Sequence, residues 1–300
     1  MGKSRLQPAT GLNDCSHCPF CRATSTVHFL FSGRRYYRCP SCDLIFAERQ
    51  ADAGANLKYY QNFYFDEHSG DQHSGQRATI YRQILDFLEE FHTKGSLLDV
   101  GCGCGLFLSE AHKRGWLIFG VDPSWQSIAL AQSMIGKHFI CGTIDDLPAD
   151  RRYDAIVMIN VLDHMVEGWQ ALKKIHHLLA PEGILYLRFP NGTFHSSVLQ
   201  FSRMISAEWF VKRILIFHEY AFTAEVVRHF LRDMGFVDIR VQNSPLTGGN
   251  LCAFDLTLAK LFRSLLSRMT WTVFKSLEHC SGGRCLWGPS LHVIARKGTK

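Results

Sequence analysis

Residues 97 to 108, Leu-Leu-Asp-Val-Gly-Cys-Gly-Cys-Gly-Leu-Phe-Leu, decide the fold of this 300-residue chain. The stretch opens with an apolar run typical of a buried parallel strand and ends with residues that begin a helix. Between them, Gly101, Gly103 and Gly105 alternate with cysteines. Glycines at a strand-to-helix turn let a ligand approach the main chain closely, and the amides at the helix N-terminus add positive partial charge. The stretch therefore predicts a nucleotide-type binding turn.

The spacing of these glycines differs from two common phosphate-binding turns. A dinucleotide turn reads G-x-G-x-x-G, and a phosphate loop reads G-x-x-x-x-G-K-[ST]. This chain reads D-x-G-x-G-x-G, with Asp99 two residues before the first glycine and no lysine at the turn. A cofactor with a carboxylate for the amides and a cationic group near the acid suits this turn. S-adenosylmethionine has both groups, and the spacing disfavours NAD.

The composition is that of a globular chain with one large or two modest domains. Hydrophobic residues make up 46% and charged residues 20%, and the net charge of +6 permits anionic partners without demanding nucleic acid. We see no secretory signal and no apolar run as long as a membrane span. Eleven cysteines, an odd number, indicate reduced thiols or metal rather than disulfides. We expect a cytoplasmic protein.

Two C-P-x-C pairs near the N-terminus predict a zinc ribbon over residues 12–50. They are separated by a distance inside the C-x₂-C-x₁₅₋₂₀-C-x₂-C zinc window. Four thiolates suit a structural zinc and leave no open position for catalysis. Cys15 offers a competing pair with Cys18, but the proline shared by both C-P-x-C pairs favours the following ligands. They are Cys18, Cys21, Cys39 and Cys42.

Residues 51–95 connect the ribbon to the glycine turn. Ala51 to Ala55 has the composition of a linker, and a helix with apolar spacing is expected from about Gln76 to Phe91. An aromatic cluster between them either packs between the domains or forms a lid over the cofactor. Its members are Tyr59, Tyr60, Phe63, Tyr64 and Phe65.

From residue 96 onward, strands and helices alternate, which predicts a parallel sheet with right-handed crossovers. The second strand ends at Asp122, about twenty residues after the glycines, where an acid can bind a ribose diol. The segment Gly142–Pro148 follows the third strand at the sheet edge where open α/β sheets bind ligands. Further strands are expected at 153–159, 184–189, 236–241 and 291–295, in a domain covering 96–300.

In this order, the segments resemble class I S-adenosylmethionine-dependent methyltransferases of the ubiquinone-biosynthesis-like group, in the branch with an N-terminal zinc ribbon. The segments that carry the likeness are Asp99–Gly105, Val121–Pro123, Gly142–Pro148, Tyr153–Val157, Asn160–His164, Leu179–Gly183, Phe189–Asn191 and His218–Thr223. The resemblance implies an α/β, Rossmann-like doubly wound sheet of seven strands with an antiparallel last strand. The cofactor contacts it implies are Asp99, Gly101, Gly103, Gly105, Asp122, Thr143, Ile144 and Asn160.

Two departures from the family pattern affect the expected site. Thr143 stands where many members carry an acid that contacts adenine, so recognition there would rest more on the main chain. The ubiquinone-type enzymes carry E-x-x-E-H where this chain has Asn160-Val-Leu-Asp-His164. Losing the first glutamate puts a catalytic divalent metal at this place in doubt.

Methyl transfer to a hydroxyl usually needs a general base, and histidine suits that role near neutral pH. The candidates are His218, just before the helix that leads to the sixth strand, and His164, just past the fourth strand. His195 is a weaker candidate. For each of them, the alternative is a structural histidine.

Two inserts near 197–217 and 251–278 carry apolar residues at helical spacing with basic residues between them. Basic amphipathic helices of this kind lie on anionic membrane surfaces. We expect O-methylation of a small-molecule, saccharide or lipid-linked acceptor, and the inserts indicate a lipid-linked saccharide or other amphiphile handled at the inner membrane surface. The alternative is an ordinary lid, or a helix that pairs two copies in a homodimer.

Two rival functions remain at this stage. In an RNA methyltransferase, the ribbon would clamp RNA with Arg34, Arg35 and Arg38, while Tyr36 and Tyr37 stack on bases. Acids in the ribbon and the lack of a long basic tract make nucleic acid the less favoured partner. A non-catalytic module that binds the cofactor is the second rival, and the intact glycine turn argues against it.

Overall fold

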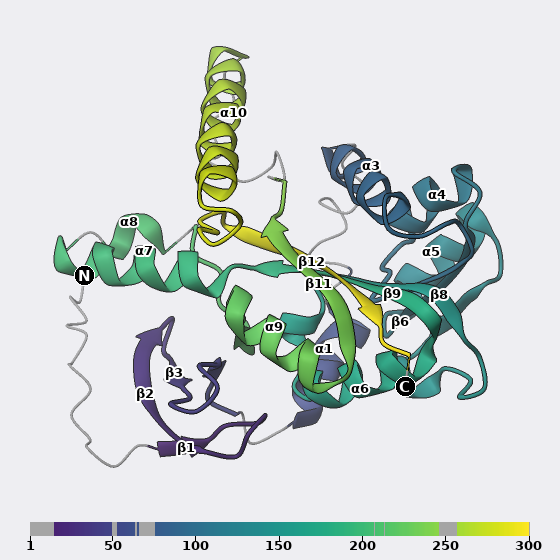
Figure 1. Cartoon of the computed structure of the whole chain (residues 1–300), viewed down its shortest axis with the longest axis horizontal. Helices are drawn as coiled ribbons and strands as arrows, with labels where there is room; N and C mark the ends of the chain where they lie inside the picture. Colours follow the sequence, from purple (N-terminus) through teal and green to yellow (C-terminus); the bar gives the residue numbers. More distant parts are fainter. Residues whose placement is uncertain are drawn as a thin grey trace.

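The computed structural model describes residues 15–49, 53–63, 65, 76–206, 208–212, 214–245 and 257–299. Side chains are described throughout these ranges except at 53, 55, 56, 76, 210 and 257–268. A central sheet and the helices on its two faces form the larger body, and a small ribbon packs beside it (Figure 1).

The central sheet has seven strands in the order β11-β12-β9-β8-β5-β6-β7. They are β5 (Ser96–Val100), β6 (Leu117–Asp122), β7 (Phe139–Cys141), β8 (Tyr153–Ile159), β9 (Leu179–Pro190), β11 (Phe236–Asn243) and β12 (Ser290–Lys297). β5 to β9 pair in parallel, whereas β12 runs antiparallel to both of its neighbours. The prediction of a doubly wound sheet of seven strands with an antiparallel last strand is confirmed. β5 lies at the point where the strand order reverses, which is where such sheets bind ligands.

Alternating side chains along β5 divide the core into two layers. Leu97 faces a cluster with helices α3 (Gln76–Glu89), α4 (Leu106–Lys113) and α5 (Trp125–Ile135). Leu98 faces a second cluster with α6 (Gly168–Leu178) and α9 (Ala224–Asp233). Figure 1 shows these two groups of helices on opposite faces of the sheet. Thr223 caps α9, and its side chain accepts a hydrogen bond from the amide of Val226.

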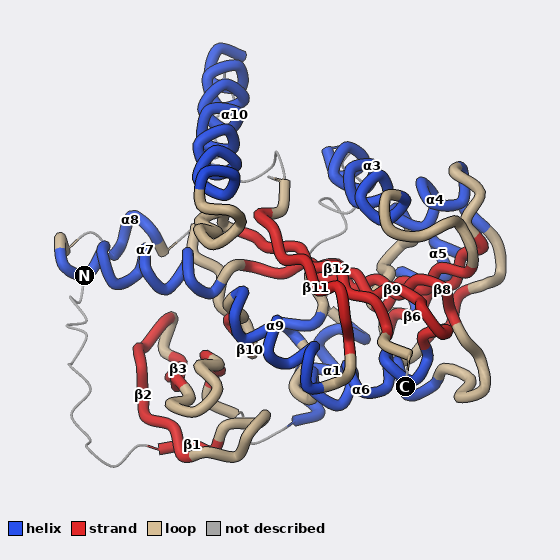
Figure 2. The backbone as a smooth tube through the Cα atoms, in the orientation of Figure 1, coloured by secondary structure: helices blue, strands red, loops and turns tan. Residues whose placement is uncertain are grey.

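The ribbon is a second sheet, with five strands in the order β1-β2-β3-β4-β10 (Figure 2). Four of its strands come from the N-terminus: β1 (Cys15–His17), β2 (Thr24–Phe31), β3 (Arg34–Arg38) and β4 (Ile45–Ala47). The fifth, β10 (Tyr220–Ala221), comes from the larger body and was not predicted. The sheet therefore joins the two parts of the chain through main-chain hydrogen bonds.

The segment after the ribbon is more ordered than its composition indicates. Helix α1 (Ala53–Asn62) begins inside the stretch expected to be a linker, so that expectation is wrong from Ala53 onward. Among the described aromatic residues that follow, Tyr59 and Tyr60 contact each other, whereas Phe63 is 59% exposed. Tyr64 lies outside the described residues.

The inserts form three helices: α7 (Gly192–Met204), α8 (Glu208–Val211) and α10 (Thr257–Cys280). In Figure 1, α7 and α8 reach beyond the sheet edge on one side, and α10 stands out from the body. The predicted apolar and basic side chains between 251 and 268 lie outside the described residues. Within the described chain, no helix has both the length and the apolar character needed to cross a membrane.

Candidate functional site

The glycine turn after β5 leaves no room for a side chain at its first glycine, Gly101. Gly101 has φ +74°, and a Cβ added there would lie 2.5 Å from Cγ2 of Val161. Gly103 has φ +51°, and its amide donates a 2.9 Å hydrogen bond to Oδ2 of Asp122. Gly105, with φ +77°, sits at the N-cap of α4. The turn thus lies against the residues that follow β8.

Two buried acids flank this turn. Asp99, on β5, is 3% exposed, and its Oδ1 has no hydrogen-bond partner in the described chain. Burial, and then the charge of Asp122, raise the pKa of Asp99 well above its usual value. Asp122, at the end of β6, accepts the amides of Gly103 and Ser124, and burial raises its pKa as well. Two buried carboxyl groups beside one turn favour a ligand with polar or cationic groups.

Two residues of α3 also face the turn, and the sequence reasoning missed them. Burial raises the pKa of the Tyr81 phenol, while the charge and hydrogen bond of Arg77 lower it. The Tyr81 ring packs edge to face on Phe107 in the first turn of α4, with centroids 5.7 Å apart, which places Tyr81 beside the glycine turn. The available signal was their spacing, because residues four apart share one face of the predicted helix.

The remaining predicted cofactor residues are partly committed to local structure. Thr143 caps a short 3₁₀ turn, where its amide and hydroxyl both bond to Oδ2 of Asp146. Ile144 is buried in the core at 4% exposure, so its main chain is what it offers to a ligand. Asn160, with φ +57°, accepts a 2.6 Å hydrogen bond from buried Arg188.

A second group of side chains gathers just beyond Val161. Asp163 and His164 lie on a 3₁₀ turn (Leu162–His164), and His218 comes from the segment before β10. The Nε2 atoms of both histidines lie 3.8 Å from Oδ2 of Asp163, and the two rings are 3.7 Å apart between centroids. Tyr60, from α1, makes a 2.7 Å hydrogen bond with Nδ1 of His164. Three segments distant in the sequence thus meet at one place.

The charges in this group are set by burial. Asp163 is 1% exposed, neither of its oxygens has a hydrogen-bond partner in the described chain, and burial raises its pKa to about 7. Burial, assisted by the positive charge of Arg34, lowers the pKa of His218 to about 4. His218 is therefore neutral at pH 7 beside an acid that titrates there, which suits proton transfer.

His195 has a structural position. Its Nε2 donates to the carbonyl of Pro289 at 3.0 Å, and its Nδ1 accepts from the amide of Ile216 at 3.4 Å. Burial lowers its pKa to about 4, in keeping with one neutral tautomer that makes both bonds. With both ring nitrogens engaged, His195 is the structural histidine that the sequence left as an alternative.

Asp163, His164 and His218 also present donor atoms within 4.8 Å of one another. Two imidazoles and a carboxylate are ligands that several divalent cations accept. The ligand type thus fits a cation, while the two 3.8 Å separations from Asp163 equally fit histidines that exchange a proton with it.

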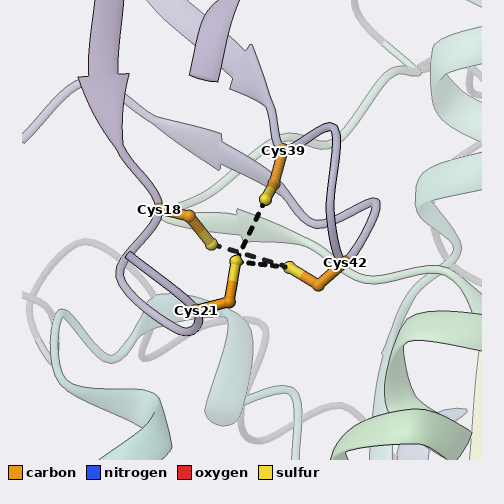
Figure 3. Close-up of side chains that lie close together, drawn as sticks. All are labelled: Cys18, Cys21, Cys39 and Cys42. Atoms are coloured by element: carbon orange, nitrogen blue, oxygen red, sulfur yellow. Dashed lines mark hydrogen bonds between the residues drawn. The ribbon is translucent and has the colours of Figure 1, made fainter. Parts of the chain in front are cut away.

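The four predicted zinc ligands come together at one end of the ribbon (Figure 3). The sulfur–sulfur distances are 3.3 Å for Cys21 and Cys39, 3.6 Å for Cys18 and Cys42, and 3.7 Å for Cys21 and Cys42. Sulfurs about 2.3 Å from a shared tetrahedral zinc would lie roughly 3.8 Å apart, so the quartet fits that ion. Cys15 lies exposed on β1, outside the quartet.

Comparison with known proteins identifies the class. Residues 73–241, more than half of the chain, match the model of the methyltransferase domain family. The chain belongs to this family, and the predicted membership of a methyltransferase family is confirmed.

The curated relatives that the chain resembles include two ubiquinone biosynthesis O-methyltransferases. A ubiquinone biosynthesis O-methyltransferase of Bradyrhizobium diazoefficiens is 28% identical over 121 residues, which cover 39% of this chain and 47% of the relative. One from Nitrobacter winogradskyi is 28% identical over 146 residues, covering 46% and 55%. The chain thus spans about half the length of the curated relatives it matches.

Solved structures show the same fold at low identity. The plantazolicin methyltransferase BpumL in complex with SAH aligns with a TM-score of 0.51 and 18% identity, over 82% of this chain and 95% of that one. The magnesium protoporphyrin IX methyltransferase of Synechocystis PCC 6803, with bound SAH, aligns with a TM-score of 0.54 and 17% identity, over 82% and 100%.

Proposed function

We propose that this protein transfers the methyl group of S-adenosylmethionine to an oxygen of its acceptor, with His218 accepting the hydroxyl proton. The observation that carries this proposal is the contact between two half-sites. Val161 packs against Gly101 of the cofactor turn, and the residues that directly follow it include Asp163 and His164. A sulfonium held at the turn therefore lies on the same side of the sheet as Asp163 and His164, which His218 contacts.

S-adenosylmethionine supplies the reactive methyl group when it is bound, and the chain supplies the positioning. Asp122 is placed to accept the ribose hydroxyls, while the amides of the glycine turn and Arg77 face the cofactor carboxylate. Asp99 stabilises the cationic part. The two buried acids beside one turn support these assignments.

The proton is handled by the buried group beyond Val161. As the acceptor oxygen bonds to the methyl carbon, its proton passes to Nε2 of His218. Asp163, at 3.8 Å, stabilises the imidazolium once it is ionised. Tyr60 holds His164 through Nδ1, which leaves Nε2 of His164 facing the same acid. His164 acts as the second candidate base.

We infer that the acceptor is a small molecule or an amphiphile such as a lipid-linked saccharide. The inserts carry large apolar side chains that stay exposed, 60% for Phe201, 82% for Met204 and 78% for Trp209. On α10, Met269, Val273 and Leu277 repeat every four residues and are also exposed. Apolar patches of this kind are typical of membrane or partner contact. The relatives named for ubiquinone biosynthesis support oxygen as the acceptor atom.

The ribbon residues are poorly placed for the rival function, an RNA clamp. Tyr36 and Tyr37 are 2% and 4% exposed, so their faces are covered. Each arginine of the proposed clamp is paired with a carboxylate: Arg34 with Glu219, Arg35 with Glu48 and Arg38 with Asp43. Base stacking needs exposed aromatic faces, and phosphate binding needs unpaired cations.

The cysteine quartet, we propose, holds a structural zinc. Four cysteine ligands close the coordination shell, so the ion stabilises the ribbon and takes no part in methyl transfer. We expect one equivalent of zinc per chain by atomic absorption and its loss in a Cys39→Ser variant.

The first experiment is calorimetric titration of the zinc-loaded protein with S-adenosylhomocysteine, with NAD as the control. Micromolar binding of the former alone supports the cofactor assignment, and no binding by folded protein contradicts it. Turnover is then assayed on phenolic, saccharide and lipid-linked acceptors, with and without vesicles containing anionic lipid. Wild-type turnover in His218→Ala would disprove the role of His218 as the general base. A requirement for added Mg²⁺ or Zn²⁺ would instead make the histidines metal ligands.

A further inference from the structure

The segment from residue 216 to 221, here called the His218 segment, is attached to the ribbon on both sides of the histidine. Before it, the hydroxyl of buried Tyr36 donates to the carbonyl of Phe217 at 3.1 Å. After it, Ala47 of β4 donates its amide to the carbonyl of Glu219 at 2.8 Å. Tyr220 and Ala221 then pair with Phe46 and Ile45.

An ion pair reinforces this attachment. Both terminal nitrogens of Arg34 bond to the carboxylate of Glu219, at 2.8 and 2.6 Å, and the same guanidinium donates to the carbonyl of Glu48. The side chains are 23% and 17% exposed, so water screens the pair less than a surface pair. A two-pronged arginine–carboxylate contact fixes direction as well as distance. Glu219 is the direct neighbour of His218, so its position sets that of the imidazole.

The larger body holds this segment mainly at its C-terminal end, where the hydroxyl of Tyr220 donates to the carbonyl of Val166 at 2.7 Å and Gly192 donates its amide to the carbonyl of Phe222 at 2.8 Å. α8 ends at Val211 and α9 begins at Ala224, and β10 spans only two residues between them. In that body, the described main-chain support for 216–219 is the contact of His195 with the amide of Ile216. Fixing the backbone of each residue costs conformational entropy, so a segment of this length needs external partners to stay ordered.

The ribbon itself cannot easily move away. Phe20 stacks on Phe230 of α9 with ring centroids 3.6 Å apart, and it meets Trp169 of α6 edge to face at 4.1 Å. Ribbon residues such as Leu44 and Phe46 belong to the same hydrophobic cluster as α6 and α9. The ribbon is therefore a fixed support for the segment it holds.

We propose that the ribbon is an intramolecular clamp that positions His218 against Asp163, and that Arg34 and Tyr36 are positioning residues for methyl transfer. This inference rests on the proposed role of His218. In this proposal the ribbon acts on the larger body of the same chain, without a nucleic-acid partner. It holds the residues on either side of His218, whereas the cofactor turn is positioned by β5 and α4.

Arg34→Gln tests the clamp, and Arg38→Gln is the matched control. Arg38 makes a comparable two-pronged pair with Asp43, but within the ribbon and away from the His218 segment. Hydrogen–deuterium exchange of the peptide covering 212–222 is measured first. We expect faster exchange in Arg34→Gln than in wild type, and unchanged exchange in Arg38→Gln. Equal exchange in wild type and Arg34→Gln would overturn the clamp whatever the role of His218.

Kinetics then test the positioning role. Arg34→Gln is expected to lower kcat about thirtyfold, part of the effect of a general base, with the affinity for S-adenosylhomocysteine within twofold of wild type. The exchanged pair Arg34→Glu with Glu219→Arg is expected to recover most of kcat, which excludes a general loss of folding. Faster exchange with an unchanged kcat would overturn the positioning role. If His218 is not the base, this is seen separately, because the His218→Ala variant then keeps full activity.

A pH series adds a readout that a purely structural role would not change. Arg34 lowers the pKa of His218, and Asp163, His164 and His195 are the other titratable groups around it. Removing the positive charge in Arg34→Gln is expected to raise the His218 pKa, measured from the imidazole NMR signal that is missing in His218→Ala. An unchanged pKa would contradict the close approach of Arg34.

Discussion

The two halves of the site are built in different ways. The proposed cofactor half consists of one continuous turn, residues 99–105, with Asp122 on the neighbouring strand, and it presents mainly main-chain amides. The acceptor half joins Tyr60 of α1, Asp163 and His164 after β8, and His218 before β10. The first half therefore depends on local backbone geometry, whereas the second depends on packing between distant segments. We expect substitutions to affect them independently.

Gly101→Ala should have the largest effect, and it should fall on the cofactor half. The added methyl group would meet Val161 at 2.5 Å in a backbone conformation that alanine rarely adopts, so the turn must shift. We expect the affinity for S-adenosylhomocysteine to fall at least about a hundredfold, an effect of roughly 3 kcal/mol. Calorimetric titration measures it.

The control for that variant is Gly115→Ala. Gly115 also has a positive φ, +91°, but a Cβ there would meet nothing within 4 Å. Its effect should be limited to a small loss of thermal stability, with cofactor binding retained. Equal loss of binding in both variants would mean that global destabilisation, and not the shape of the turn, explains the result.

This difference between the halves also explains what the sequence could predict. The turn from Asp99 to Gly105 carries its glycines and its acid within seven residues, so spacing alone indicates a cofactor. β10 has two residues, too few for any periodicity, and nothing in the sequence pairs Tyr220 with Phe46. Tyr60 was visible only as part of an aromatic cluster, since its partner lies about a hundred positions away.

Asp163→Asn should have the next largest effect, and it should affect only the acceptor half. The variant cannot stabilise an imidazolium on His218, so kcat should fall on the order of a hundredfold while cofactor affinity stays unchanged. The wild-type rate should also decline as the pH falls through about 7, where Asp163 takes up a proton. A pH–rate profile of kcat checks this. The decline should be absent in Asp163→Asn and retained in the surface variant Asp145→Asn.

The same substitution should raise stability. Burial raises the Asp163 pKa from 3.8 to about 7, so the folded state holds its proton more tightly than the unfolded state does. Stability is therefore lost as the pH rises from about 4 to 7 and stays low above it, a cost of order 4 kcal/mol. Asp163→Asn should unfold at a higher temperature than wild type at pH 8, and the difference should vanish near pH 4. A lower melting temperature at pH 8 would contradict the unpartnered buried carboxylate.

Removal of zinc should affect the acceptor half of the site and leave the cofactor half unchanged. Loss of the ion unfolds the ribbon, and with it the strand that pairs with β10. We expect kcat to fall roughly fiftyfold, more than in Arg34→Gln because all contacts of the ribbon with the His218 segment are lost, and less than the loss of the base itself. The affinity for S-adenosylhomocysteine should persist, because the described contacts of the ribbon are with α6, α7, α9 and the His218 segment. The affinity for S-adenosylhomocysteine is measured by calorimetry before and after chelation of zinc, and a sample with zinc restored is the control.

Tyr60→Phe should have the smallest effect, because it removes one hydrogen bond from a histidine that stays in place. The 2.7 Å contact with Nδ1 of His164 fixes which nitrogen faces Asp163, so losing it permits the other tautomer. A single hydrogen bond contributes about 1 kcal/mol, so kcat should fall about fivefold. The matched control is Tyr59→Phe, on the same helix, which should leave kcat unchanged. A loss as large as that of Asp163→Asn would mean that α1 contributes directly to the chemistry and that the acceptor half extends into the segment before the sheet.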